Sequence, residues 1–240
     1  MENGIYLGVA RQMALKTSMD IVANNIANMN TAGFRSQTPL FEQYLSRRPD
    51  QNSDKLAFPY DYGQFQNTAP GPQEQTGEPL QVALNGPGFI AIRAADGSTA
   101  YTRDGNFQRA ADGTMVTQAG FAVLSNGGPI SLPANSIEIS IDESGVVSNQ
   151  NGSLGKIQVA EFDNLQGLKP LGDNLYTTNE TPKDASGTTV HQGFIEGSNV
   201  NAVLETTRMI EILRNYQAVQ NMLNNEHDRL RSAIQKLMQV

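Results

Sequence analysis

Apolar residues recur at alternating intervals of three and four along residues 199–240. One seam runs through this segment and is interrupted only by Glu226: Met209, Ile212, Tyr216, Val219, Leu223, Glu226, Leu230, Ala233 and Leu237. Because neither Gly nor Pro follows Gly197, this heptad spacing predicts one uninterrupted helix. At 1.5 Å per residue the helix would be roughly 60 Å long. Such a helix needs a second apolar stripe to cover its seam; a long core helix of an ordinary globule is the alternative.

A matching stripe lies at the other end of the chain. The same spacing selects Ile5, Gly8, Gln12, Leu15, Met19, Val22 and Ile26, and the face is widened by Tyr6, Val9 and Met13. We expect a helix from Asn3 to about Asn28, followed by a stop signal that includes Gly33. Four Asn within residues 24–30 weaken a helix, so we expect them to serve close packing against neighbouring helices; a frayed helix end is the alternative.

Between residues 80 and 178 the pattern changes to short apolar or alternating runs. These runs are separated by Asp-Gly and Asn-Gly pairs, which suit tight hairpin turns, and they predict an antiparallel, all-β domain. The expected strands are 80–84, 89–93, 99–102, 107–110, 114–117, 121–124, 137–141, 146–147, 156–162 and 175–177.

Residues 36–79 hold six Pro and many Gln and Asn, which predicts an extended linker. Its aromatic side chains either anchor it to a partner or pack on its own subunit. The fold class is therefore α+β. Terminal helices (1–35 and 199–240) form a discontinuous, coiled-coil-like domain, the linker leads to the β domain (80–178), and residues 179–198 are a return segment.

The composition narrows the classes of function. The 240 residues carry a formal net charge of -7 and no Cys, which argues against nucleic-acid binding through a basic face and excludes disulfides and thiol catalysis. Each terminal segment carries +1, which leaves -9 for residues 36–198. No apolar run approaches about 18 residues, so no membrane insertion is expected. The N-terminus lacks a signal-peptide pattern, which taken alone predicts a cytoplasmic protein.

We find no residues for an enzyme, a metal site or a cofactor. His191 and His227 are the only histidines; they lie far apart in the sequence, and each lacks the nearby constellation of Asp or Ser that catalysis would require. Asp96, Asp104 and Asp112 each precede Gly, so turn formation explains them better than metal binding does.

Three motifs carry a resemblance to a known family. Asn24-Asn25-Ile26-Ala27-Asn28 followed by Thr31-Ala32-Gly33-Phe34-Arg35 resembles the N-terminal signature of the flagellar rod and hook family of bacterial axial proteins. The second motif resembles the family's central segment: Gly88, Phe89, Tyr101, Thr102, Arg103, Gly105 and Phe107. The third, Glu196-Gly197-Ser198-Asn199-Val200-Asn201, is similar to the segment that opens the C-terminal helix. The motifs cover both ends and the centre of the chain.

The resemblance implies a structural subunit of the flagellar basal-body rod that assembles helically through its terminal helices and transmits motor torque. Other rod subunits, further copies of this chain, and the flagellar type III export apparatus with its chaperones or gate are the implied partners. It also implies a periplasmic location reached without a cleaved signal, in place of the cytoplasmic one. The opening residues resemble the larger proximal type of rod protein. The alternatives are the distal type and, from another class, a β-rich module that binds cell-wall polysaccharide.

We expect two sets of residues to contact neighbouring subunits. The N-terminal set is Asn24, Asn25, Ile26, Ala27, Asn28, Gly33 and Phe34. The C-terminal set is Met209, Ile212, Tyr216, Val219, Leu223, Leu230 and Leu237.

Overall fold

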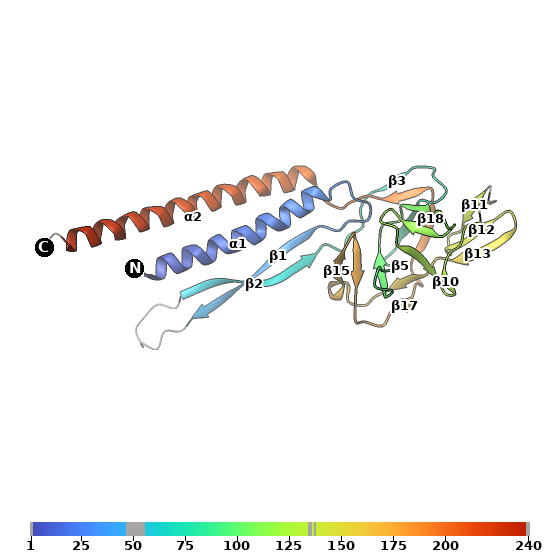
Figure 1. Cartoon of the computed structure of the whole chain (residues 1–240), viewed down its shortest axis with the longest axis horizontal. Helices are drawn as coiled ribbons and strands as arrows, with labels where there is room; N and C mark the ends of the chain where they lie inside the picture. The colour runs from blue at the N-terminus through green and yellow to red at the C-terminus, as the bar shows by residue number, and fades with distance from the viewer. Residues whose placement is uncertain (1, 47–55, 134–135, 137, 239–240) are drawn as a thin grey trace. The chain divides into compact units, whose positions relative to one another are not determined.

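The computed structural model describes residues 2–46, 56–133, 136 and 138–238 (Figure 1). The chain folds as two units. The helical unit consists of Met1–Ala27, Gln37–Asn67 and Asn201–Val240, and the β unit consists of Asn28–Ser36 and Thr68–Val200. The chain therefore passes from one unit to the other four times, and both terminal helices belong to the same unit.

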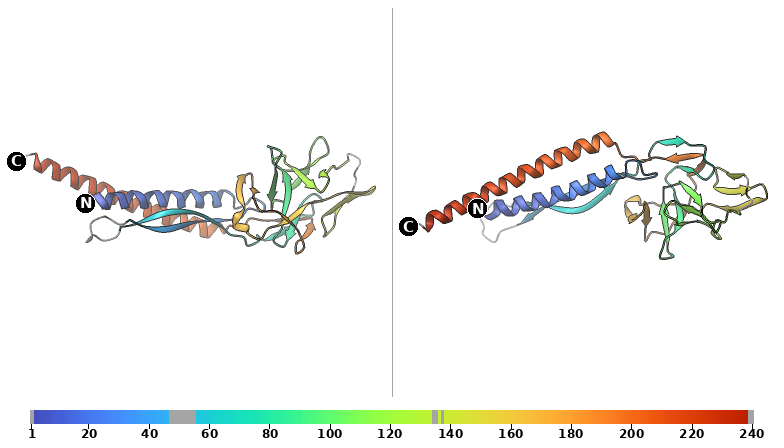
Figure 2. Two further views of the ribbon diagram at one scale, coloured as in Figure 1. Left: turned by 90° about the horizontal axis from the view of Figure 1, so that it is seen from below. Right: turned by 45° about the horizontal axis from the view of Figure 1, so that its top comes forward.

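Two long helices pack along each other in the helical unit. They are α1 (Glu2–Ala27) and α2 (Ala202–Leu237), and Figure 2 shows them side by side in both views. The Asn201 side chain caps α2 by accepting a hydrogen bond of 3.1 Å from the Leu204 amide, which satisfies one of the open N–H groups of the first turn. The α+β prediction with long helices at both ends is confirmed.

The less exposed positions of α2 follow the expected spacing as far as Leu230. Gly8 of α1 lies against this seam, and a Cβ there would come within 2.7 Å of Leu223 Cδ2. Gly4 and Ile5 lie across a small hollow from Glu226 and Arg229, so the last residues of α2 extend past the start of α1 (Figures 1 and 2). Ala233 and Leu237, which we expected in the seam, are therefore exposed.

The expected linker is instead partly a hairpin. Strands β1 (Gln37–Ser46) and β2 (Leu56–Gln66) pair antiparallel over their whole length, with an irregularity between Leu40 and Phe41, and both pack on α1. The prediction failed because we treated Pro as a breaker. Both strands of a two-stranded hairpin are edge strands, and an edge strand tolerates the missing N–H of a Pro such as Pro39 or Pro59. Pro49 lies outside the described residues.

The β unit is built around one large antiparallel sheet. Its described strands are β5 (Phe89–Arg93), β6 (Thr99–Thr102), β7 (Phe107–Arg109), β8 (Met115–Thr117), β9 (Ala122–Ser125), β10 (Gly128–Pro129), β14 (Val159–Glu161), β15 (Lys169–Gly172), β16 (Leu175–Thr177) and β17 (Lys183–Asp184). The main path runs β15-β16-β6-β5-β9-β8-β7. A 3₁₀ turn, η1 (Leu165–Gly167), precedes β15.

Smaller pairings complete the unit. Strands β11 (Ile139–Ile141), β12 (Val146–Asn149) and β13 (Gly152–Lys156) form a three-stranded sheet, while β18 (Thr189–Gln192) pairs with β4 (Val82–Asn85) and β19 (Phe194–Glu196) with β3 (Gln73–Gln75). Residues 179–198 are therefore not a plain return segment, because three strands of the β unit lie in them. The single strand expected over 156–162 is wrong as well: β13 ends at Lys156 and β14 begins at Val159.

The core lies on both faces of β5. Phe89 and Ala91 pack into one apolar cluster with Tyr101, whereas Ile90 and Ile92 pack into another. Successive side chains of a strand point to opposite faces, so a strand whose residues are all apolar is suited to being covered on both sides. The continuous apolar run from Phe89 to Ile92 thus places β5 at the centre of the unit.

Candidate functional site

Asn25 of the first motif holds three segments of the helical unit together. Its side chain is 1% exposed. Its Nδ2 donates to the Gln37 carbonyl at 2.8 Å and to Glu205 Oε2 at 3.1 Å, and its Oδ1 accepts from the Gln37 amide at 2.9 Å. One amide side chain therefore joins the end of α1, the start of β1 and the first turn of α2. This use of both donor and acceptor explains an Asn at a helical position where it lowers helix propensity.

Glu205 is the acidic partner in this contact. It is buried in the first turn of α2, where the helix dipole favours a negative charge. Arg208, one turn further on, forms a 2.6 Å ion pair with Glu205 Oε1, so the two carboxylate oxygens have separate partners. Glu205 was not predicted from the sequence; an acidic residue four positions after the N-cap was the available signal.

Gly33 lies in the part of the first motif that belongs to the β unit. Its φ is +66°, a conformation that costs other residues energy. Its amide donates to the Glu196 carbonyl at 2.8 Å. A Cβ at this position would lie 2.4 Å from the carbonyl carbon of Arg103, so only Gly permits this approach of the first motif to the second and third.

Arg35, Arg103 and Glu196, one residue from each motif, meet in the interior of the β unit. Their exposed fractions are 3%, 1% and 1%. Arg103 Nε donates to Glu196 Oε2 at 2.9 Å, and Arg35 Nη2 lies 3.6 Å from Glu196 Oε1. Both guanidinium carbons lie 5.8 Å from the centre of the Phe89 ring, a favourable position for a cation. We call these three charged residues the Arg–Glu–Arg cluster.

The two arginines of the cluster differ in how well they are satisfied. Arg103 also donates to the carbonyls of Gly86, Gly88 and Leu84. Arg35 Nε and Nη1 are buried without a hydrogen-bond partner. Burial, and secondly the charge of Arg103, lower the pKa of Arg35 from its ordinary value. The interior thus holds two cations and one anion at this point.

Asn199 of the third motif fastens the neighbouring backbone segments. Its Oδ1 accepts from the Ser36 amide at 2.7 Å, its Nδ2 donates to the Ala69 carbonyl at 2.8 Å, and its own amide donates to the Phe34 carbonyl at 3.2 Å. Each partner lies close to a point where the chain passes between the units. The sequence identified Asn199 only as a member of the third motif, and its hydrogen bonds were not predicted.

The other candidate residues fall into two groups. Phe34 is buried in the β unit, as are Phe89, Tyr101, Thr102 and Phe107 of the second motif, and Gly105 lies so close to Val82 that a Cβ would meet the Val82 carbonyl oxygen at 1.8 Å. The side chains of Asn24 and Ala27 are exposed, and those of Ile26 and Asn28 are half-buried. The motifs are therefore largely internal, and their exposed members lie on the last turn of α1 or at its end.

The turn aspartates serve their own loops. Oδ1 of Asp96, Asp104 and Asp112 each accepts a hydrogen bond from the backbone amide two residues later, at 2.9 Å. Asp104 is the least exposed of the three, and burial raises its pKa to about 6. Among the described residues, no three His, Asp or Glu side chains are grouped so that they could hold a metal ion.

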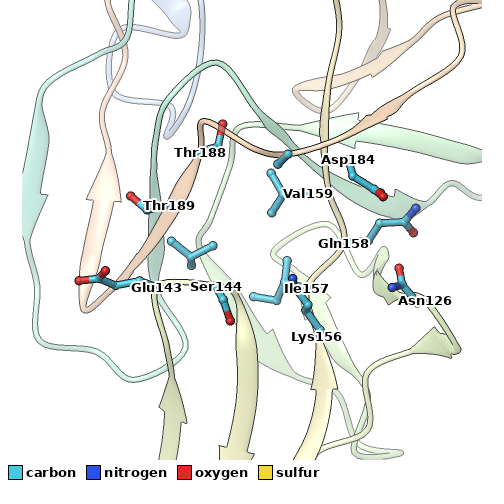
Figure 3. A pocket seen from close by; sticks show the side chains of 12 residues that line it. Asn126, Glu143, Ser144, Lys156, Ile157, Gln158, Val159, Asp184, Thr188 and Thr189 are labelled. Atoms are coloured by element: carbon cyan, nitrogen blue, oxygen red, sulfur yellow. The ribbon is translucent and has the colours of Figure 1, made fainter.

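A cavity of about 470 Å³ opens in the β unit; it is lined mainly by the turn before β12 and by residues 156–159, 184–185 and 188–190 (Figure 3). Figure 3 shows the carboxylates of Glu143 and Asp184 on opposite sides of it. Its lining also contains Lys156, the amides of Asn126 and Gln158, hydroxyls and aliphatic side chains, but no aromatic ring. A stacking surface for a sugar is thus missing from this cavity.

Comparison with known proteins agrees with the three motifs. Three family models match: "Flagella basal body rod protein" over residues 5–35, "Flagellar hook protein FlgE/F/G D1 domain" over 83–149, and "Flagellar basal body rod FlgEFG protein C-terminal" over 191–236.

In the part of the chain that the structure describes, neither helix combines the length and apolar character needed to span a bilayer.

Curated relatives align along nearly the whole chain. The flagellar basal-body rod protein FlgF of Caulobacter vibrioides is 39% identical over 99% of this chain and 98% of its own length. FlgG proteins of Buchnera aphidicola subsp. Schizaphis graminum and Bacillus subtilis are 31% and 30% identical, over 95% and 98% of this chain and the same shares of their own lengths. With its motifs joined in one fold and its whole length matched, the chain belongs to the family of flagellar basal-body rod proteins, which are structural subunits and not enzymes.

Proposed function

We propose that this chain is the larger proximal subunit of the rod, and that it assembles helically through apolar stripes of α1 and α2 to transmit motor torque. The opening residues, Met1 to Tyr6 followed by Arg11, Gln12 and Met13, support the proximal type. The distal type of the same family is the alternative. Membership of the family already implies assembly with other rod subunits.

The observation that carries the proposal is that each helix has an apolar stripe outside the packed seam. The stripe on α1 consists of the exposed residues Tyr6, Val9 and Met13. The stripe on α2 consists of the exposed residues Val203, Ile210 and Leu213. The spacings of three, four and seven place each set on one side of its helix. Met13 is 67% exposed and Val203 is 78% exposed. Side chains with so much exposed surface contribute little to the core of their own chain.

Covering these stripes would stabilise an assembly. Fully burying one large apolar side chain contributes roughly 1.5–3 kcal/mol. Because these six side chains are already about half covered, covering both stripes supplies roughly 5–10 kcal/mol before the cost of association, which is of a similar order. The stripes lie on different helices and are not copies of one surface, so a contact between them joins unlike faces and does not close into a dimer. Repeated contacts of this kind build a helical filament.

Periplasmic location and passage through the flagellar type III export apparatus, with its chaperones or gate, belong to the same proposal. Family membership supports both. A chain without Cys can cross into an oxidising compartment with no disulfide to form wrongly.

Replacing one stripe residue tests the assembly surface. We expect Leu213→Asp to prevent the growth of assemblies in sedimentation and negative-stain microscopy, because it places a charge in the apolar contact. Asn225→Asp is the matched control: Asn225 is an exposed residue of the same helix, about a third of a turn round from Leu213.

Both variants should keep the helical circular-dichroism signal of the unmodified chain. If Leu213→Asp assembles as well as Asn225→Asp does, in the presence of purified neighbouring rod subunits as well as alone, the stripe is not an assembly surface.

A further inference from the structure

The Arg–Glu–Arg cluster brings together residues that are far apart in the chain. Arg35 follows α1, Arg103 lies in the middle of the β unit, and Glu196 lies six residues before α2. All three are buried. An unpaired charge in a protein interior is strongly destabilising, whereas a paired one is tolerated. Burying Arg35 beside Arg103 therefore depends on the presence of the Glu196 carboxylate.

Arg103 does not depend on Glu196 alone. Three backbone carbonyls, those of Leu84, Gly86 and Gly88, also accept from its guanidinium, and all three lie before it in the same unit. Arg35 has Glu196 as its ion-pair partner and is left with two buried N–H groups unpaired even so. Without Glu196, burying Arg35 beside Arg103 would bring two like charges together with no anion between them.

The backbone contacts of residues 28–36 also come mainly from residues 196–199. The Gly33 amide donates to the Glu196 carbonyl, the Asn199 amide to the Phe34 carbonyl, and the Ser36 amide to Asn199 Oδ1. Glu196 Oε1 also accepts from the Gly71 amide at 3.2 Å. Asn174 contributes one further bond, from its Nδ2 to the Ala32 carbonyl. Most of what holds this segment in place therefore comes from residues 196–199.

We propose that Glu196 acts as a closing residue: residues 28–36 dock into the β unit only when the Glu196 carboxylate enters between Arg35 and Arg103. The segment that follows α1 is then fixed only after the segment that precedes α2 is in place. During synthesis or export from the N-terminus, the chain keeps this segment undocked until its last strand, β19, is present. The core around β5 forms independently of this step.

Hydrogen exchange of the full chain, followed by mass spectrometry, tests the proposal. In Glu196→Gln, which keeps the side chain's shape and removes its charge, we expect the amides of residues 28–36 to exchange roughly 100-fold faster, the scale expected for breaking a buried ion pair. Residues 89–92 should keep their protection. Glu74→Gln is the matched control, because Glu74 is an exposed carboxylate on the neighbouring strand β3 and should have no effect.

A double variant separates charge from hydrogen bonding. If the unpaired cation is the cause, adding Arg35→Met to Glu196→Gln should restore at least 10-fold of the lost protection in residues 28–36. Unchanged exchange in Glu196→Gln, or a double variant no better protected than the single one, would overturn the proposal.

Refolding of the unmodified chain gives a test that needs no variant. Pulse-labelling should show residues 28–36 becoming protected together with residues 194–199 and after residues 89–92. Protection of residues 28–36 before residues 194–199 would equally overturn it. This measurement decides the matter even if Glu196→Gln fails to fold.

Discussion

Replacing Asn25 with Asp changes one amide nitrogen into an oxygen and leaves the shape of the side chain unchanged. The amide donates two hydrogen bonds through Nδ2, to the Gln37 carbonyl at 2.8 Å and to Glu205 Oε2 at 3.1 Å. In Asn25→Asp both acceptors face an oxygen instead of a donor. The third bond, from the Gln37 amide, remains available. The variant therefore tests the two donated bonds and nothing else in the packing.

The magnitude follows from burial and charge. Leaving a buried acceptor unsatisfied costs about 1–3 kcal/mol, and two acceptors are affected. The new carboxylate would also stand about as close to Glu205 as the amide does, where repulsion between unit charges is worth roughly 4–5 kcal/mol at an effective dielectric constant of 20. Arg208 offsets part of this repulsion. We expect a loss of roughly 3–5 kcal/mol of stability in the helical unit.

Asn24→Asp supplies the matched control. Asn24 is the preceding residue and its side chain is exposed, so the same substitution there adds the same charge near the C-terminal end of α1. That position costs about 0.3–1 kcal/mol through the helix dipole in either variant. The difference between the two variants then isolates the buried contact.

Urea unfolding followed by circular dichroism at a helical wavelength measures this difference, at protein concentrations where assembly is absent. The signal reports mainly on α1 and α2, the only described α-helices. A difference between Asn25→Asp and Asn24→Asp of less than about 1 kcal/mol, below the cost of even one unsatisfied buried group, would refute the account of Asn25 as the link between three segments.

Three further perturbations have defined outcomes. Because burial raises the pKa of Asp104 to about 6, the native state holds this proton more tightly than the unfolded state, whose value is near 4. Stability should therefore fall by roughly 2–3 kcal/mol as the pH rises from 4 to 6, and urea titrations should show this fall disappearing in Asp104→Asn. Gly33→Ala should cost about 3 kcal/mol or more, from its left-handed φ and the clash with Arg103, and should speed hydrogen exchange in residues 28–36. Gly8→Ile should lower the thermal midpoint of the helical signal, because its branched side chain meets Leu223. Gly8→Ala should stay within about 1 kcal/mol, since better helix propensity offsets a contact with a flexible side chain.

The elements that the sequence predicted best are those whose residues agree locally with the structure around them. The apolar run from Phe89 to Ile92 predicted β5 with its observed bounds. The seam of α2 was predicted correctly through Leu230, since every position obeyed one period. The hairpin of β1 and β2 was missed, because the register of two strands joined by a long connection depends on α1 beneath them. Nothing in the composition of residues 36–79 shows that support.

The contacts of the motifs could not be predicted, because each depends on a partner far away in the chain. Asn25 meets a residue 180 positions later, and Arg103 meets one 93 positions later. No spacing rule connects such pairs. The sequence nonetheless marked the places where local rules are broken, such as Asn within a helix. Departures of this kind are expected where tertiary contacts override local preference.

Two sets of residues in the chain have different tasks. The buried polar residues make their contacts inside the chain: Asn25 with Glu205, and the charges of the Arg–Glu–Arg cluster with one another. They therefore determine the stability of the folded subunit. The exposed stripes of α1 and α2 obey the helical period and yet find no cover in the described chain. A change in the first set should therefore lower the stability of the isolated subunit at any concentration. A change in the second set should leave that stability intact and weaken only the contacts between subunits. Unfolding of the dilute protein should therefore respond to the first set, and sedimentation of the concentrated protein should respond to the second.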